Sequence, residues 1–146
     1  MKTQLVFSFL LISLIGCRAK NITPITDLLR KIWQAESVTE SQQLVYAKGA
    51  TNNIKPGYIN FRLDLSQPGV VHLKDIDGRL ITGTYTVSTD NKRLILDSLI
   101  PKPSNTGGII EYYILAGSDG GSLKLERTAE SRKTGNTVNQ YALIPE

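Results

Sequence analysis

Apolar and polar residues alternate along much of the chain, and this period of two indicates half-buried strands of an antiparallel sheet. The clearest run covers residues 58–65, where polar Asn60, Arg62 and Asp64 separate apolar side chains. The side chains expected to face the core in this run are Ile59, Phe61, Leu63 and Leu65. Similar runs predict further strands at residues 31–38, 44–48, 70–76, 79–87, 92–96, 109–115, 122–127 and 136–144.

Short turn sequences separate these runs. Asp77-Gly78 is the strongest hairpin signal, and Asp90-Asn91 and the Gly-rich residues 119–121 make two more turns. Residues 101–108 form a longer loop rich in Pro, Ser, Asn and Gly. Short strands joined by tight turns predict a mainly β fold, an antiparallel up-and-down β-barrel, although a flattened sandwich with the same number of strands fits the pattern too.

One short helix is expected before the strands, at about residues 24–32. Thr23 suits the N-cap, Pro24 suits the first helical position, and Asp27 places a negative charge in the first turns, where the helix dipole favours it. Leu28, Leu29, Ile32 and Trp33 follow at helical spacing.

The N-terminal segment has the pattern of a secretion signal. A short basic start precedes an apolar run at residues 5–15, which would span about 16 Å as a helix and is too short to cross a roughly 30 Å hydrocarbon core. The run ends in Leu14-Ile15-Gly16-Cys17, which resembles the lipobox of bacterial lipoproteins. That resemblance implies cleavage between Gly16 and Cys17 and attachment of lipid to the Cys17 thiol, which is the only thiol in the sequence. A conventional signal with a coincidental cysteine is the alternative.

Three segments follow from this interpretation: a signal peptide at residues 1–16, a lipidated tether at 17–23 and one domain at 24–146. Two or three acyl chains such as palmitate would hold the protein on a membrane, since a single chain binds only reversibly. Arg18 occupies the second mature position, where Asp is the familiar signal against outer-membrane sorting. We therefore expect a cell-envelope protein anchored to the outer membrane on its periplasmic side.

The arrangement of the domain resembles the lipocalin-like domains of many bacterial lipoproteins. Three stretches carry the resemblance: residues 28–33 (LLRKIW), where a helix leads into a Trp-bearing strand, residues 83–94 (GTYTVSTDNKRL) and residues 122–126 (SLKLE). The family implies an up-and-down barrel, often with a cavity for a small apolar molecule. One departure is clear, because the family usually has glycine two residues before the tryptophan and this chain has Lys31.

Catalytic, metal and nucleotide motifs receive no support from the sequence. The net charge of +4 is spread thinly, which disfavours a nucleic-acid interface, and no Gly-rich phosphate loop is present. His72 is the only histidine and has neither a free cysteine nor further ligands in a metal spacing, so a strand residue that faces solvent or makes a hydrogen bond is expected. Asp75-Ile76-Asp77-Gly78 mimics the start of a calcium loop, but the twelfth position is Thr86 and not glutamate. Neither enzymatic activity nor a cofactor or metal is therefore expected.

Two functions remain open for the domain. The first is binding of a small hydrophobic ligand or envelope component inside the barrel, and the alternative is docking of a partner envelope protein through residues 37–56 and 101–108. A cavity of several hundred cubic ångströms would favour the first, and a filled interior beside an exposed apolar patch would favour the second. The candidate ligand-binding residues, for which packing in the core is an equally good account, are Trp33, Phe61, Tyr85, Tyr112 and Tyr141.

Overall fold

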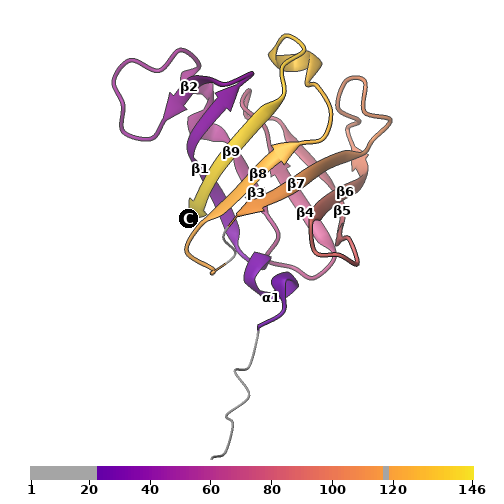
Figure 1. Cartoon of the computed structure of the whole chain (residues 1–146). Helices are drawn as coiled ribbons and strands as arrows, with labels where there is room; N and C mark the ends of the chain where they lie inside the picture. The colour runs from indigo at the N-terminus through magenta and orange to yellow at the C-terminus, as the bar shows by residue number, and fades with distance from the viewer. Residues whose placement is uncertain (1–22, 117–118) are drawn as a thin grey trace, which may run out of the picture.

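The protein is a closed antiparallel β-barrel with one short helix, as a computed structural model that describes residues 23–116 and 119–146 shows (Figure 1). The expected signal peptide, the Gly16–Cys17 cleavage site and most of the tether lie outside the described residues. The nine strands are β1 (Ile32–Glu40), β2 (Gln43–Ala47), β3 (Arg62–Asp64), β4 (Val70–Lys74), β5 (Leu80–Val87), β6 (Arg93–Ile100), β7 (Ile110–Ala116), β8 (Leu123–Arg127) and β9 (Asn139–Pro145).

Strand β1 closes the barrel. From β3 to β9 each strand pairs with its neighbour in sequence, and β9 then pairs with β1 through a register that runs from Trp33 opposite Pro145 to Glu40 opposite Asn139. The first half of β1 also pairs with β3, which completes a ring of eight strands. Strand β2 pairs only with the second half of β1 and extends this ring as a hairpin. The mainly β fold class and the lipocalin-like barrel are therefore confirmed, and the alternative of a flattened sandwich is not the structure.

The turns between strands alternate between the two ends of the barrel, and the hairpin signals fall where they were expected. Gly78 takes a left-handed backbone with φ of 80° between β4 and β5, and its amide donates to the carbonyl of Asp75 at 2.8 Å. Asn91 takes φ of 59° between β5 and β6, a conformation that asparagine tolerates better than most residues. The only expected strand that is much longer in the structure is the one at residues 92–96, because β6 continues to Ile100.

Helix α1 (Ile25–Leu29) is shorter than the expected span of residues 24–32. Pro24 occupies the N-cap position in place of Thr23, and Ile32 and Trp33 belong to β1. The helix ends early because the indole nitrogen of Trp33 donates to the carbonyl of Leu29 at 2.9 Å, which ties the last turn to the start of the strand. Figure 1 places α1 across one end of the barrel, where Leu29 is fully buried. Among the residues described, no helix has the length and apolar composition needed to span a membrane.

The expectation of one continuous strand at residues 58–65 is wrong in its first half. Residues Pro56–Asn60 form a 3-10 helix (η1), and only Arg62–Asp64 join the sheet as β3. The turn buries Tyr58, whose hydroxyl donates to the carboxylate of Glu40 at 2.7 Å, and leaves Ile59 64% exposed instead of in the core. The other three expected core positions, Phe61, Leu63 and Leu65, are buried.

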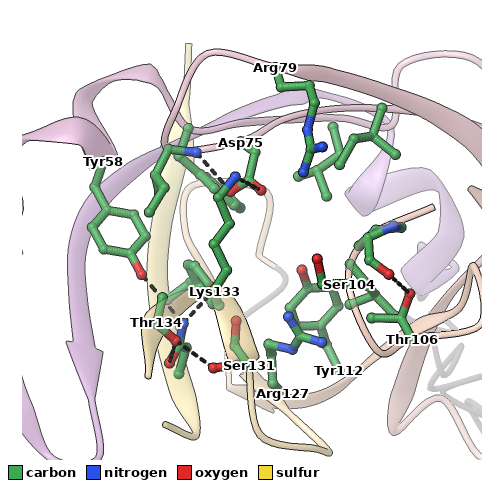
Figure 2. A pocket seen from close by; sticks show the side chains of 18 residues that line it. Tyr58, Asp75, Arg79, Ser104, Thr106, Tyr112, Arg127, Ser131, Lys133 and Thr134 are labelled. Atoms are coloured by element: carbon green, nitrogen blue, oxygen red, sulfur yellow. Dashed lines mark hydrogen bonds and ion pairs between the residues drawn. The ribbon is translucent and has the colours of Figure 1, made fainter. Parts of the chain in front are cut away.

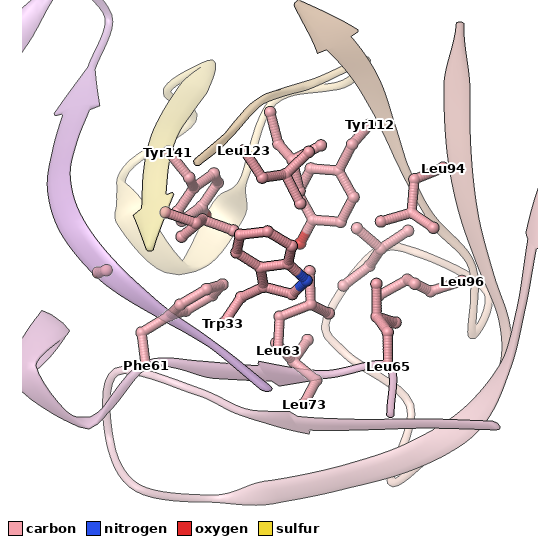
Figure 3. Packing of buried hydrophobic residues seen from close by; sticks show 14 of the residues in the cluster. Trp33, Phe61, Leu63, Leu65, Leu73, Leu94, Leu96, Tyr112, Leu123 and Tyr141 are labelled. Atoms are coloured by element: carbon pink, nitrogen blue, oxygen red, sulfur yellow. The ribbon is translucent and has the colours of Figure 1, made fainter. Parts of the chain in front are cut away.

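The barrel interior is filled by its own side chains (Figure 3). Trp33 lies at the centre of the cluster with no exposed surface, and leucines from most strands surround it. Close packing of this kind is typical of small eight-stranded barrels, whose interior is just wide enough for side chains to fill. The fully buried side chains include Leu29, Leu63, Leu65, Val71, Ile81, Leu94, Leu96, Leu99, Leu123 and Leu143.

Candidate functional site

A small cavity lies at the end of the barrel opposite α1, which we call the mouth (Figure 2). The mouth is built from η1, the turn between β4 and β5, the loop at residues 101–108, the end of β8 and the 3-10 helix η2 (Arg132–Thr134). The cavity volume is about 40 Å³, which is room for about three water molecules. The lining residues are Tyr58, Phe61, Leu73, Asp75, Ile76, Arg79, Ile81, Pro103, Ser104, Thr106, Ile110, Tyr112, Arg127, Ser131, Lys133, Thr134, Asn139 and Tyr141.

Arg127 is the most unusual residue of this lining. It is the last residue of β8 and stands opposite Tyr112 of β7, on the same inward-facing side of the strand as Leu123 and Leu125. Its Nε is buried and makes no hydrogen bond to any described residue. A buried donor without a partner costs about 1–3 kcal/mol, so native proteins rarely keep one without a reason.

Arg79 approaches the same cavity from the turn between β4 and β5. Figure 2 shows the guanidinium groups of Arg79 and Arg127 pointing into the cavity from opposite sides. Within the described chain, neither guanidinium has a carboxylate within 4.0 Å, whereas Lys133 is paired with Asp75 and with Asp77 at 2.7 Å each. The two arginines therefore contribute positive charge that the described protein does not neutralise locally.

Three tyrosine hydroxyls and one amide line the inner wall of the mouth. The side-chain nitrogen of Asn139 donates to the hydroxyls of Tyr58 and Tyr141 at 3.3 Å each, and its oxygen accepts from Thr137 at 2.6 Å. Burial raises the pKa of Tyr112 and of Tyr141, and for both groups the positive charge of Arg127 acts in the opposite direction. The hydroxyls of Tyr112 and Tyr141 are therefore neutral at physiological pH and available as hydrogen-bond donors.

Behind Tyr58 lies a buried carboxylate. Glu40 is 5% exposed, accepts the Tyr58 hydroxyl and forms an ion pair with Lys55. Burial, followed by the charge of Tyr141 and the bond to Glu40, raises the pKa of Tyr58. This network fixes η1 against β1 and so holds one wall of the mouth in place.

Another part of the lining is apolar. Phe61, Ile81 and Ile110 are buried core residues whose side chains also reach the cavity, and the ring of Phe61 stacks on that of Tyr141 with centroids 5.0 Å apart. The mouth therefore joins an apolar wall to a group of hydrogen-bond donors. Such a combination is typical of small-molecule sites, in which a few polar groups orient a ligand against apolar side chains.

Three of the five candidate ligand-binding residues line the mouth, namely Phe61, Tyr112 and Tyr141. The other two do not. Trp33 lies in the closed centre of the barrel, and the hydroxyl of Tyr85 donates to the carbonyl of Leu65 at 3.2 Å within the core.

Sequence reasoning missed the polar residues of the mouth. The sequence could have shown that Arg127 points into the barrel, because it continues the inward alternation of Leu123 and Leu125. Arg79 and Lys133 had no such signal, because both lie in turns and their meeting depends on which strand ends share one end of the barrel.

The remaining sequence candidates lie elsewhere. His72 is half-buried on β4 between buried Val71 and Leu73. No three His, Cys, Asp or Glu side chains gather in a metal-binding group within the described residues. Residues 101–108 contribute Pro103, Ser104 and Thr106 to the mouth.

The other expected docking segment, residues 37–56, consists mostly of the hairpin of β1 and β2 and the loop that follows it. The outer edge of β2 is already bonded, because the Asn53 side chain pairs with the backbone of Ala47 and the Lys55 amide donates to Val45. This strand edge is therefore not free to pair with another chain.

Comparisons with known proteins do not assign this chain to a family. No protein-family model matches the chain, and no curated protein matches it. A solved structure of an uncharacterized protein from Bacteroides eggerthii is similar, with a TM-score of 0.45 and 10% sequence identity over 80% of this chain and 98% of that one.

Proposed function

We propose that this chain is a lipid-anchored protein of the bacterial cell envelope that binds a small molecule at the mouth of its barrel. The observation that carries the binding function is the mouth cavity itself, where an apolar wall of core residues faces donors such as the buried, unpartnered Nε of Arg127. Because core side chains fill the barrel interior, a ligand inside the barrel could enter only as far as the mouth cavity.

The size of the cavity limits how a ligand binds. About 40 Å³ accepts a small group of a ligand and not a whole fatty acid, because sites for entire drug-sized molecules are about 300–1,000 Å³. A ligand would insert one polar group and lay a small apolar part against Phe61, Ile81 and Ile110. The hydrophobic ligand expected from the family resemblance is thus narrowed to a small amphipathic molecule at the rim.

The anchor supplies the location. Lipid on Cys17, with cleavage after Gly16, would hold the barrel on a membrane, which for a chain with Arg18 after the cysteine we propose to be the outer membrane on its periplasmic side.

Mass spectrometry of the protein from membranes of its native host tests both parts. In neutral detergent the intact mass is expected to show two or three acyl chains, and a Cys17→Ser variant should lose them. Native spectra should show a further small-molecule mass that disappears on denaturation. Unmodified thiol at Cys17 would refute the anchor, and the absence of any released mass would refute an abundant resident ligand.

A pair of neighbouring variants locates the ligand. Ile110 is 4% exposed and lines the cavity, whereas Ile109 is 47% exposed on the outer face. Ile110→Trp fills the mouth and should reduce the ligand-bound fraction at least fivefold, while Ile109→Trp should leave it unchanged, with circular dichroism confirming that both variants fold. Equal ligand occupancy in the two variants would place the ligand elsewhere.

Docking of a partner envelope protein is the second candidate. The observation in its favour is exposed apolar surface at both ends of the 101–108 loop, where Ile100 is 69% and Ile109 47% exposed. A photo-crosslinker at position 100 in the native envelope should then give one defined adduct, and an Ile109→Ser change should weaken it. A smear of unrelated adducts would argue against a specific partner.

A further inference from the structure

The charges at the mouth do not balance. Four charged side chains line the cavity, and three of them, Arg79, Arg127 and Lys133, are basic. The single acid, Asp75, is already engaged, because one of its oxygens pairs with Lys133 and the other accepts the Ile76 amide at 2.7 Å. Asp77 also pairs with Lys133 from just outside the lining, so these five side chains carry one more positive than negative charge, and neither arginine has a carboxylate within 4.0 Å.

The mouth also holds a hydrogen-bond donor that has no partner in the described protein. The guanidinium of Arg127 offers donors only, and its Nε–H is covered by protein and unpaired. The hydroxyl of Tyr112, which is opposite Arg127 in the sheet, has no hydrogen bond among the described residues, and Ser104 and Ser131 add further hydroxyls to the lining. A neutral ligand could accept from the buried Nε–H but would leave the charge of Arg127 unpaired, whereas an anion would satisfy both its charge and its donors.

We infer that the mouth recognises a small water-soluble acidic ligand through its carboxylate or phosphate group, which binds between Arg127 and Arg79 with Tyr112 as a third donor. This inference rests on the proposed function, because it names the ligand class of that same site. The planar donor fork of arginine matches the two oxygens of such a group, which lysine cannot do. Lys133 acts in a different way, since its ion pairs with Asp75 and Asp77 hold the rim of the mouth together.

The position of the helix indicates that the ligand comes from the aqueous side. Helix α1 lies at the end of the barrel opposite the mouth (Figure 1). Thr23 is six positions after Cys17, so the tether reaches at most about 20 Å. A lipid on Cys17 would therefore keep the α1 end near the bilayer and turn the mouth away from it, toward soluble molecules and not lipid headgroups.

The test uses the full lipidated protein in neutral detergent and in a buffer free of phosphate. The probes are hexanoate, inorganic phosphate, neutral hexanamide and, as a source of lipid headgroups, dihexanoyl-phosphatidylglycerol. The readout is the Nε–H resonance of Arg127 in a proton–nitrogen correlation spectrum, together with a dissociation constant from titration. Hexanoate or phosphate is expected to shift this resonance at concentrations at least tenfold lower than hexanamide does.

Two variants and one control test whether Arg127 and Arg79 supply the positive charge that binds the anion. Arg127→Gln is expected to weaken binding of the anion at least tenfold and Arg79→Gln about threefold to tenfold. Arg93→Gln removes a guanidinium from the outer surface, where it pairs with Glu111, and should change nothing. Arg79 is exposed on a turn, so its variant remains informative even if Arg127→Gln does not fold.

Each outcome decides a specific point. Equal binding of hexanoate and hexanamide would overturn the acidic ligand class and leave small-molecule binding at the mouth standing. Binding of dihexanoyl-phosphatidylglycerol alone would overturn the water-soluble source. Binding by none of the probes, with the Arg127 resonance unmoved, would overturn the inference together with the proposed binding function.

Discussion

The indole Nε1 of Trp33 donates a 2.9 Å hydrogen bond to the carbonyl oxygen of Leu29, and both residues are fully buried. Trp33 is the first inward-facing side chain of β1, and Leu29 is the last residue of α1. The bond therefore joins the helix that closes one end of the barrel to the strand that closes its sheet. It also explains why the helix stops before Lys31, whose amide bonds to the same Leu29 carbonyl at 2.7 Å.

Trp33→Phe removes this donor and leaves space at the centre of the core. We expect a loss of about 2 kcal/mol in the free energy of unfolding, from the hydrogen bond and the cavity together. Urea denaturation followed by far-ultraviolet circular dichroism measures it, because the variant lacks the only tryptophan. Ile59→Ala on the exposed face of η1 is the control and should change stability by less than about 0.5 kcal/mol. Similar losses in the two variants would contradict the central role of Trp33.

Gly83 lies on β5 at a break in its register with β6. A Cβ at this position would overlap the carbonyl oxygen of Asp97 and lie 2.9 Å from the Leu99 side chain. Gly83→Ala must displace the backbone of β6, so we expect a cost of about 1–3 kcal/mol in chemical denaturation. Gly121→Ala provides the matched control, because its nearest contact is an ordinary 3.4 Å to the Asp119 carboxylate. An unperturbed Gly83→Ala protein would show that the two strands separate easily.

The barrel was predictable because its strands and turns carry local signals. Alternation located the strands, and Asp77-Gly78 and Asp90-Asn91 located their turns. Alternation failed at Tyr58 and Ile59, where a tyrosine hydroxyl reaches a buried carboxylate and the local pattern gives no sign of that distant partner. Pro56, two residues before that run, was the one available signal for a 3-10 turn, since proline favours the first helical position.

The polar mouth was less predictable than the barrel for a related reason. Its charged residues come from segments far apart in sequence, with Asp75 and Lys133 separated by 58 positions. A single strand pattern can show that Arg127 points inward, but it cannot show what lies opposite. That information depends on how the ring of strands closes, because closure decides which turns share one end.

Glu40 offers a contrast between a buried and a surface ion pair. Its carboxylate is 5% exposed and holds both Lys55 and the Tyr58 hydroxyl, so Glu40→Gln weakens two contacts that fix η1. We expect a loss of about 2 kcal/mol, which is below the cost of breaking a fully buried pair because Lys55 still reaches water. Glu111→Gln, which breaks the surface pair with Arg93, should cost less than about 1 kcal/mol. If the two losses are equal, Glu40 does not have the structural role assigned to it.

Alkaline pH should lower the stability of the fold, because three buried tyrosines keep their protons only while the protein is folded. Burial raises the pKa values of Tyr58, Tyr112 and Tyr141 above the ordinary value of 10.0, so the folded state keeps protons that the unfolded state releases. Stability is then fully present below pH 10 and falls as the pH rises above it, by about 1.4 kcal/mol per pH unit for each tyrosine that ionises only on unfolding. Denaturation midpoints measured from pH 8 to pH 12, with phenolate absorbance at 295 nm, test this. Tyr112→Phe should make the decline shallower, whereas Tyr113→Phe on the exposed outer face should not. Ionisation of Tyr58, Tyr112 and Tyr141 near pH 10 with the barrel still folded would show that the mouth admits water far more freely than its packing indicates.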